Sequence, residues 1–205
     1  MTIQDDGRET LSSAPDEELM QRYAQGEVEA FDELFQRHKN AVYAFIYHFV
    51  RISDSRDDLF QNVFLRIIRY RNQYKPTAKF TTWLFAITRS VCIDAMRKSH
   101  NANIIPLFPD GEDERDGGRE MEPVCGGLSP REALHRSEIQ RAIEETIRTL
   151  PPEQREVLLL REKTNLTFEE IAEAAGCSPN TVKSRMHYAL LALRKELRKR
   201  GIDSL

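Results

Sequence analysis

The chain has 205 residues, a length that fits one large domain or two small ones. Its apolar share of 40% and charged share of 31% are those of a globular protein, and they exclude collagen-like or largely disordered chains. No apolar run approaches the roughly 18 residues of a membrane-spanning helix, and the amino terminus lacks the basic and apolar pattern of a secretory signal. We therefore expect a cytoplasmic protein without membrane insertion.

The net charge of -3 conceals two acidic and two basic blocks. Residues 1–20 hold six acidic side chains against one arginine, and residues 101–132 hold eight against three basic ones. Residues 66–98 hold eight lysines and arginines against one aspartate, and residues 179–200 hold seven against one glutamate. Two basic blocks indicate a protein that contacts phosphates at two places, although two solvated helix faces would give the same counts.

Helical periodicity runs through residues 16–100. A short helix follows the candidate N-cap Asp16 and ends near Gly26. Apolar side chains three and four residues apart then predict one long amphipathic helix, and two more apolar stripes follow over residues 59–68 and 83–95. The stripe of the long helix consists of Phe31, Leu34, Phe35, His38, Val42, Phe45, Ile46 and Phe49. Since alternating strand-like runs are missing, the sequence predicts an all-α domain of four helices.

Residues 101–129 lose this periodicity and are rich in glycine, proline and acidic side chains. We expect them to form a flexible acidic linker between two independently packed units, because so long a structureless loop is unusual inside one domain. The acidic residues 1–15 are expected to be disordered. Helical patterning resumes at Pro130 and predicts a second domain of four helices over residues 130–200.

The second domain contains a predicted helix-turn-helix. Thr167 and Glu170 have the spacing of a capping box, Gly176 permits the left-handed backbone that ends a helix, and Ser178-Pro179 supplies the next N-cap and first turn. Helices joined by so short a turn must cross steeply, and the small Ala172 lets them approach. The inner stripe of the second helix is predicted to consist of Val182, Met186, Leu190, Leu193 and Leu197.

The outward face of that second helix has the chemistry that a DNA major groove requires. Its cations can reach guanine acceptors, while short hydroxyls and an amide suit phosphates or base edges. A helical hairpin with a solvated basic face is the weaker alternative. The predicted groove-facing residues are Asn180, Thr181, Lys183, Ser184, Arg185 and His187.

The first basic block alternates aromatic and basic side chains. Rings among cations can stack on unstacked single-stranded bases while the cations follow the backbone. We expect Tyr74 to be exposed in a polar loop and Trp83 and Phe80 to fill the core. The aromatic members are Tyr70, Tyr74, Phe80, Trp83 and Phe85, and the basic members are Arg66, Arg69, Arg71, Lys75, Lys79 and Arg89.

These motifs, in this order, resemble the extracytoplasmic-function (ECF) group of bacterial RNA polymerase sigma factors over nearly the whole chain. The resemblance rests on Asp58-Leu59-Phe60-Gln61-Asn62-Val63-Phe64, on Phe80-Thr81-Thr82-Trp83-Leu84 followed by Ile93-Asp94 and Arg97-Lys98, on Leu150-Pro151-Pro152, and on Thr181-Val182-Lys183-Ser184-Arg185. It implies two helical domains, core RNA polymerase and promoter DNA as partners, generally an anti-sigma factor as well, and no chemistry or cofactor of its own.

The resemblance also implies roles for individual residues. A first set would contact core polymerase, namely Asp58, Gln61, Asn62 and Phe64. A second set would meet the minus-ten element, namely Tyr74, Thr88, Arg89, Ser90, Arg97 and Lys98. The outward face of the helix-turn-helix would read the minus-thirty-five element. The chain departs from the family pattern at Asn62, Ala86, Ser90 and Lys183, where Glu, Arg, Asn and Arg are common, so the minus-ten base preference does not carry over.

Two other functions are considered. A stand-alone helix-turn-helix regulator with an N-terminal sensing or dimerisation domain explains residues 167–200 equally well, but it leaves the first basic block without a purpose. An enzyme is disfavoured because His38 lies on an apolar stripe and no metal-binding or phosphate-loop motif accompanies it. The cysteines Cys92, Cys125 and Cys177 are too far apart in the sequence for a CxxC-type zinc site, so no metal is expected.

Overall fold

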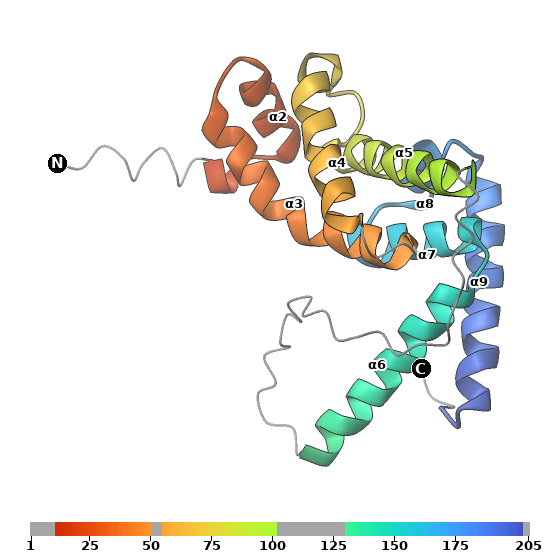
Figure 1. Cartoon of the computed structure of the whole chain (residues 1–205). Helices are drawn as coiled ribbons and strands as arrows, with labels where there is room; N and C mark the ends of the chain where they lie inside the picture. The colour runs from red at the N-terminus through yellow and green to blue at the C-terminus, as the bar shows by residue number, and fades with distance from the viewer. Residues whose placement is uncertain (1–10, 51–54, 102–129, 203–205) are drawn as a thin grey trace.

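The computed structural model describes residues 11–50, 55–101 and 130–202, and every element within these ranges is helical (Figure 1). The N-terminal half consists of α2 (Asp16–Ala24), α3 (Val28–Phe49), α4 (Arg56–Tyr70), the short 3-10 helix η1 (Arg71–Gln73) and α5 (Phe80–Asn101). The C-terminal half consists of α6 (Pro130–Thr149), α7 (Pro152–Thr164), α8 (Phe168–Ala175) and α9 (Pro179–Lys199). The all-α prediction is confirmed. The predicted linker lies outside the described residues from residue 102 onward.

The long helix α3 is the centre of the N-terminal half and follows the predicted apolar periodicity. Its buried side chains face α2, α4 and α5, which all pack against it. Aromatic rings dominate this core, since Phe45 lies 5.1 Å from Phe49 and 5.8 Å from Phe85 between ring centroids. The three-and-four spacing therefore produced both the helix and the face that it buries.

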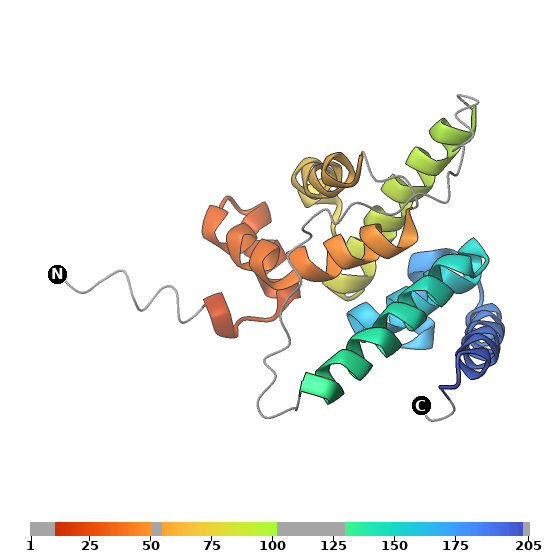
Figure 2. The ribbon, with the colours of Figure 1, turned by 60° about the horizontal axis from the view of Figure 1, so that its bottom comes forward.

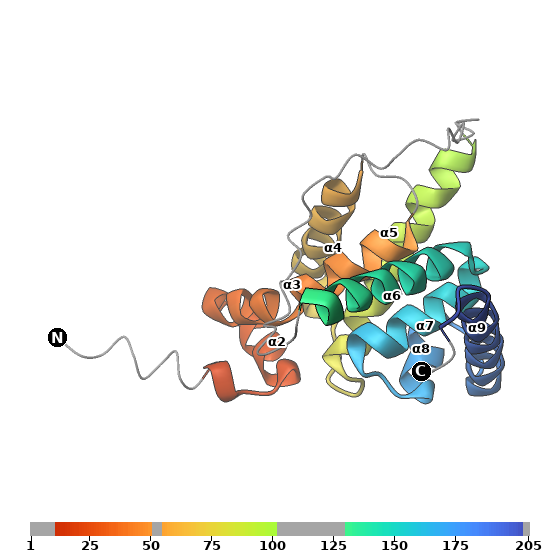
Figure 3. The ribbon, with the colours of Figure 1, turned by 90° about the horizontal axis from the view of Figure 1, so that it is seen from below.

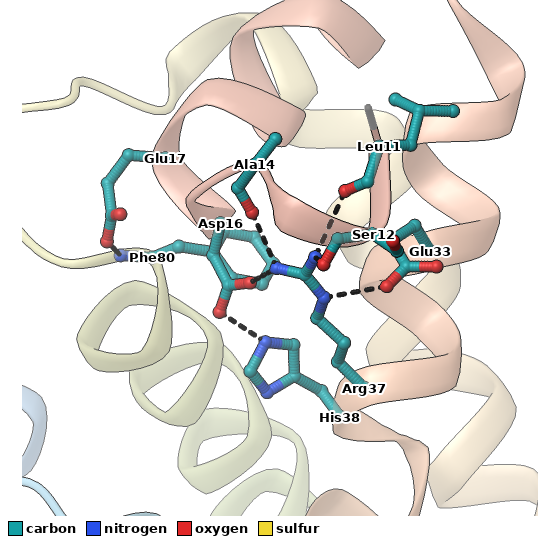
Figure 4. A network of polar contacts seen from close by, with 9 residues as sticks. All are labelled: Leu11, Ser12, Ala14, Asp16, Glu17, Glu33, Arg37, His38 and Phe80. Carbon is teal, nitrogen blue, oxygen red and sulfur yellow. Dashed lines mark hydrogen bonds and ion pairs between the residues drawn. The ribbon is translucent and has the colours of Figure 1, made fainter. Parts of the chain in front are cut away.

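A polar network around Arg37 anchors the start of the chain to α3 (Figure 4). The Arg37 guanidinium donates to the Asp16 carboxylate at 2.8 Å and to the carbonyl oxygens of Leu11, Ser12 and Ala14. His38 Nε2 lies 2.6 Å from the other Asp16 oxygen. Asp16 is thus the first residue of α2 and makes no cap, contrary to the predicted N-cap, because its carboxylate is turned toward α3.

The same network corrects the expected boundary of the acidic N-terminus. Leu11 and Ala14 are buried against the core, and their carbonyl oxygens are held by Arg37. Residues 11–14 are therefore ordered, although the sequence predicted disorder up to residue 15. The physical reason is that a single arginine on α3 satisfies several backbone acceptors at once, which a reading of local composition does not detect.

Replacing Asp16 by asparagine should lower the free energy of unfolding by about 1 to 2 kcal/mol at neutral pH. Burial alone would raise the pKa of Asp16, but hydrogen bonds and charges from His38 and Arg37 outweigh it and hold the pKa below its ordinary value of 3.8. The carboxylate therefore stabilises the fold above that value, and this contribution is lost as the pH falls through the lowered pKa.

Urea unfolding of the wild type and the Asp16→Asn variant between pH 7 and pH 3 measures this effect. The difference between the two proteins should shrink toward acid pH. Asp32→Asn is the matched control, because Asp32 is exposed on α3 and its replacement should change stability little. A difference that stays constant down to pH 3 would show that the Asp16 charge is unimportant.

The C-terminal half packs its four helices around a second set of apolar side chains. Helix α9 contacts α6, α7 and α8, and Val157, Leu160, Ile171 and Val182 are fully buried between them. The break at Pro151-Pro152 ends α6 and begins α7, with Pro152 in the first turn where no backbone donor is needed. The four predicted helices of this domain are confirmed.

The two halves lie in contact with each other. Figures 2 and 3 show the C-terminal helices, coloured teal to blue, along one side of α3 and α5. Helix α7 packs against α3 and helix α8 against α5, and the buried apolar residues of both halves form one continuous cluster. This differs from the expected independence of the two units. The physical reason is that contact between the carboxyl end of α3 and the apolar face of α7 removes apolar side chains of both helices from water.

Candidate nucleic-acid and protein interfaces

Helices α8 and α9 form the predicted helix-turn-helix, and both caps are present. Thr167 Oγ1 accepts a hydrogen bond from the Glu170 N–H at 3.2 Å, and the Glu170 carboxylate accepts one from the Thr167 N–H at 2.8 Å. Gly176 has a φ of 66°, in the left-handed region that suits glycine. Ser178 Oγ accepts from the Thr181 N–H at 3.1 Å and begins α9. The turn between the helices is therefore built by local sequence.

The first turns of α9 expose much of the set predicted to face a DNA groove. Its start carries no acidic side chain, so the exposed cations and polar groups meet no local negative charge. Amide, ammonium, hydroxyl and imidazole groups on one helix end can reach base edges and phosphates in a major groove. The exposed members are Asn180, Lys183, Ser184 and His187.

Two members of the predicted set are engaged locally. Thr181 Oγ1 lies 2.9 Å from Ser178 Oγ, so this hydroxyl belongs to the helix cap. The half-buried Arg185 leans back toward the turn, where its Nη1 donates to Cys177 Sγ at 3.9 Å. Lys183, rather than Arg185, is therefore the cation that this structure presents to solvent at the start of α9.

The predicted inner stripe of α9 is wrong at one position. Leu190 is exposed, and the smaller Ala189 is fully buried in its place. Residue 189 lies nearer than residue 190 to the centre of the face defined by Val182, Met186 and Leu193, given 3.6 residues per turn. Apolar size favoured Leu190 in the sequence, whereas the close approach of the neighbouring helices selected the alanine.

The aromatic side chains of the first basic block are less exposed than a stacking surface requires. Phe80 and Phe85 are buried, which confirms the prediction for Phe80. Trp83 is half-buried against the core. Tyr74 is also half-buried, with its hydroxyl donating to the Ala78 carbonyl oxygen at 2.8 Å and its ring 5.3 Å from that of Trp83. Tyr74 was expected to be exposed, and the structure leaves it only partly so.

Packing also changes the ionisation of Tyr74. Burial, together with the nearby charges of Glu17 and Asp16, raises the pKa of Tyr74 to about 12. The phenol therefore stays protonated and remains a donor. This hydroxyl holds the loop between η1 and α5 in place, and only part of the ring is open to a base.

The remaining residues assigned to the minus-ten element fall into two groups along α5. Thr88 is buried, and its hydroxyl donates to the Leu84 carbonyl oxygen at 2.9 Å, so it offers no surface to DNA. Arg89 forms an ion pair with Glu156 of α7. Ser90, Arg97 and Lys98 are exposed, and the Ser90 hydroxyl accepts from Arg66 at 3.2 Å.

Helix α4 presents a solvent-exposed face that contains most of the predicted polymerase contacts. Asp58, Gln61 and Asn62 are exposed on this face. Leu65 lies on the same face and is 59% exposed, the most exposed leucine among the residues that the structure describes. Its position four residues after Gln61 and three after Asn62 was the signal that sequence reasoning missed.

Phe64 differs from its predicted neighbours. Its side chain is buried, and its ring packs 4.7 Å from Phe35 and 5.0 Å from Phe60. A core role therefore explains Phe64, and its side chain presents little surface to a partner. The exposed face of α4 thus consists of Asp58, Gln61, Asn62 and Leu65.

Within the described ranges, no group of three or more histidine, cysteine or acidic side chains is arranged to hold a metal ion. None of the helices that the structure describes has the length and apolar character to cross a membrane.

Comparison with known proteins gives matches in both halves. Residues 34–101 match the family Sigma-70 region 2, and residues 140–193 match the family Sigma-70 region 4. An ECF RNA polymerase sigma-E factor of Haemophilus influenzae is 30% identical over 178 residues, which cover 85% of this chain and 90% of that protein. The RNA polymerase sigma factor CarQ of Myxococcus xanthus is 29% identical over 178 residues, which cover 87% and 95%.

Two solved structures share the fold. CnrH, in complex with the cytosolic domain of CnrY, has a TM-score of 0.64 at 22% identity and covers 90% of this chain and 97% of its own. The sigma factor RpoE of Bartonella quintana, in complex with the anti-sigma factor NepR, has a TM-score of 0.64 at 20% identity and covers 82% and 96%. At these identities the two structures establish the arrangement of helices alone.

Proposed function

Because this chain belongs to the ECF group of RNA polymerase sigma factors, we propose that it binds core RNA polymerase and directs it to specific promoters. It acts through binding alone, in the cytoplasm where polymerase works, and needs no cofactor. A stand-alone helix-turn-helix regulator would need a sensing or dimerisation domain in its N-terminal half. Residues 34–101 instead match Sigma-70 region 2, so this alternative is excluded.

The observation that carries the proposal is the presence, in one chain, of a capped helix-turn-helix and an exposed face on α4. The first presents Lys183 and Ser184 to duplex DNA at the minus-thirty-five element. The second presents Asp58, Gln61 and Leu65 to the polymerase. Exposed Ser90, Arg97 and Lys98 on α5 are then available to the melted minus-ten strand.

Regulation by an anti-sigma factor is part of the proposal. The two solved proteins of the same fold are each in complex with another protein, named as an anti-sigma factor for the Bartonella quintana pair. The described surface of this chain includes an exposed apolar set on α9, formed by Tyr188, Leu190 and Leu191. Co-purification of the tagged chain with its bound proteins is the direct test of such a partner.

In vitro transcription with purified core polymerase and genomic DNA tests the proposed function. Added protein should create new transcription starts, each preceded by a shared pair of upstream sequence elements at a fixed spacing. Core polymerase alone is the control. If the protein neither co-purifies with core polymerase nor creates new starts, the proposal is wrong.

Replacing Leu65 by alanine should weaken binding to core polymerase about 5- to 30-fold. The exposed leucine side chain would be buried in the complex, and its removal should cost about 1 to 2 kcal/mol of binding free energy. Stability of the free chain should change little. Val28→Ala is the matched control, because Val28 is also 59% exposed but lies on α3 outside this face. Fluorescence titration with core polymerase measures both variants, and equal weakening would place the contact elsewhere.

A further inference from the structure

The contact between the two halves contains charged groups that the proposed function leaves unexplained. Glu156, on α7, is 3% exposed, and the structure pairs its carboxylate with the Arg89 guanidinium on α5. Lys79, just before α5, pairs with Glu170 of α8 at 2.8 Å. Both cations belong to the first basic block, and both carboxylates come from the C-terminal half. Two cations of the first basic block are therefore paired with acids of the same chain, of which Lys79 stays 60% exposed and Arg89 30% exposed.

Further polar contacts hold the halves in this position. Arg155 of α7 donates to the Phe49 carbonyl oxygen at the end of α3 at 3.1 Å. Arg148 of α6 donates to the Tyr47 hydroxyl at 3.2 Å, and its guanidinium lies 5.6 Å from the centre of the Tyr47 ring. Together with the apolar cluster shared by both halves, these contacts define one arrangement of α7 and α8 against α3 and α5 (Figure 3).

This arrangement occupies one cation in the middle of α5. The Arg89 side chain is 30% exposed and is paired with Glu156 of α7, whereas Ser90 beside it and Arg97 and Lys98, two turns further along, are exposed. A single strand can therefore approach the carboxyl end of α5 but meets Glu156 when it reaches Arg89. A carboxylate and a phosphate oxygen offer an arginine the same kind of charged acceptor, so they compete for one guanidinium.

We propose that the free chain masks part of its own strand-binding surface. Glu156 occupies the place on Arg89 that a phosphate of the strand would take. Single-stranded DNA must therefore displace Glu156 and separate the two halves, and we call this arrangement self-masking. This inference rests on the proposed role of α5 in strand capture. It adds that the C-terminal half, besides reading duplex DNA, acts as an internal competitor for the melted strand.

The electrostatics of Glu156 are consistent with a displaceable contact. Burial raises the pKa of Glu156 above its ordinary value even though the charge and hydrogen bond of Arg89 act in the opposite direction. A buried ion pair gains little net stability, because removing both charges from water offsets their attraction. Separation of the halves returns the carboxylate to water while the arginine gains a phosphate. The ion pair itself therefore contributes little net free energy that opposes the exchange.

Arg185 links the same carboxylate to the DNA-reading helix. The positive charge of Arg185 on α9 acts to lower the pKa of Glu156, as that of Arg89 does. The Glu156 carboxylate is therefore paired with a cation of α5 and is also influenced by a cation of α9.

The test compares Glu156→Gln with Glu153→Gln in the full chain. Glu153 is exposed one turn earlier on α7, so its replacement removes the same charge without breaking the contact with Arg89. Binding of a fluorescein-labelled, mixed-sequence 20-nucleotide single strand is measured by anisotropy at fixed salt. Glu156→Gln should raise the affinity about 10-fold, which corresponds to about 1.4 kcal/mol, and Glu153→Gln less than about 2-fold. Equal affinities of the two variants overturn the proposal.

A second measurement uses the wild type and does not depend on whether the variant folds. Förster energy transfer between one dye on α2 and one on α9 should give a larger distance between the two halves with a saturating single strand than for the chain alone. A distance unchanged by the bound strand would overturn self-masking. Transcription from mapped promoters distinguishes the proposed sigma factor function from self-masking. New transcription starts without separation of the two halves would support the sigma factor function and contradict self-masking. The absence of new starts would contradict the sigma factor function itself.

Discussion

Replacing Arg155 by alanine should lower the free energy of unfolding by about 3 to 5 kcal/mol, the largest stability loss that we expect from a single polar side chain of this protein. Arg155 is 2% exposed, and its guanidinium donates to the carbonyl oxygens of Phe49, Arg148 and Leu150 at 2.9 to 3.1 Å. These acceptors lie at the carboxyl ends of α3 and α6, where helix carbonyl groups lack partners within the helix. Without the guanidinium, buried acceptors lose their donors and the positive charge no longer faces two negative helix ends.

Chemical unfolding monitored by far-ultraviolet circular dichroism measures this loss. Lys163→Ala is the matched control, because Lys163 is an exposed cation on the same helix and its replacement should change stability by less than about 0.5 kcal/mol. Arg155→Lys should recover only part of the loss, since one ammonium group cannot span carbonyl oxygens on two helices as a planar guanidinium does. Equal stabilities of the Arg155→Ala and Lys163→Ala variants would contradict the role assigned to Arg155.

Replacing Lys183 by alanine should weaken holoenzyme binding at the minus-thirty-five element by about 1 to 3 kcal/mol, while binding of core polymerase stays unchanged. Lys183 is exposed in the second turn of α9, whereas Arg185 is drawn back toward Cys177. Of these two cations, Lys183 is therefore the better placed to meet a base edge or phosphate. If it contacts a phosphate, the salt dependence of binding should also decrease by about one unit of slope.

Lys195→Ala is the control for this prediction, because Lys195 is an exposed lysine on the same helix but lies about three turns further from its start. Electrophoretic mobility shift of the reconstituted holoenzyme on a mapped promoter, at several salt concentrations, measures both variants. Lys195→Ala should have the smaller effect and should weaken all sequences alike. If the two variants lose affinity equally and without regard to sequence, the lysine at the start of α9 does not read the promoter.

Local patterns in the sequence were sufficient for the helices and for the helix-turn-helix. The three-and-four spacing placed α3, and the capping box at Thr167, the left-handed Gly176 and the Ser178 cap placed the turn before α9. These features depend on contacts within a few residues, so they can be recognised without knowing what else is nearby. The family assignment followed from the order of such motifs along the chain, and the matches to sigma regions 2 and 4 confirm it.

The accessibility of individual site residues could not be read from the same patterns. Phe64 and Thr88 lie in motifs that predict binding, yet both side chains are buried. Arg89 and Arg185 are cations in basic segments, but each is drawn toward another part of the chain, one to Glu156 and the other to Cys177. Leu65 shows the converse, an apolar side chain left outside the core. Burial depends on which surfaces meet, and a single helix does not contain that information.

By itself, the sequence determined the helical class of this protein, the caps and turn of its DNA-binding motif, and its membership of the sigma factor family. The tertiary structure alone decided that Asp16 turns toward Arg37 and His38, that Arg155 serves two helix ends, and that Glu156 covers Arg89. The physical reason is range. Helix periodicity and capping act between neighbours in the chain, whereas these charge contacts join residues that are 21 to 106 positions apart or belong to different helices.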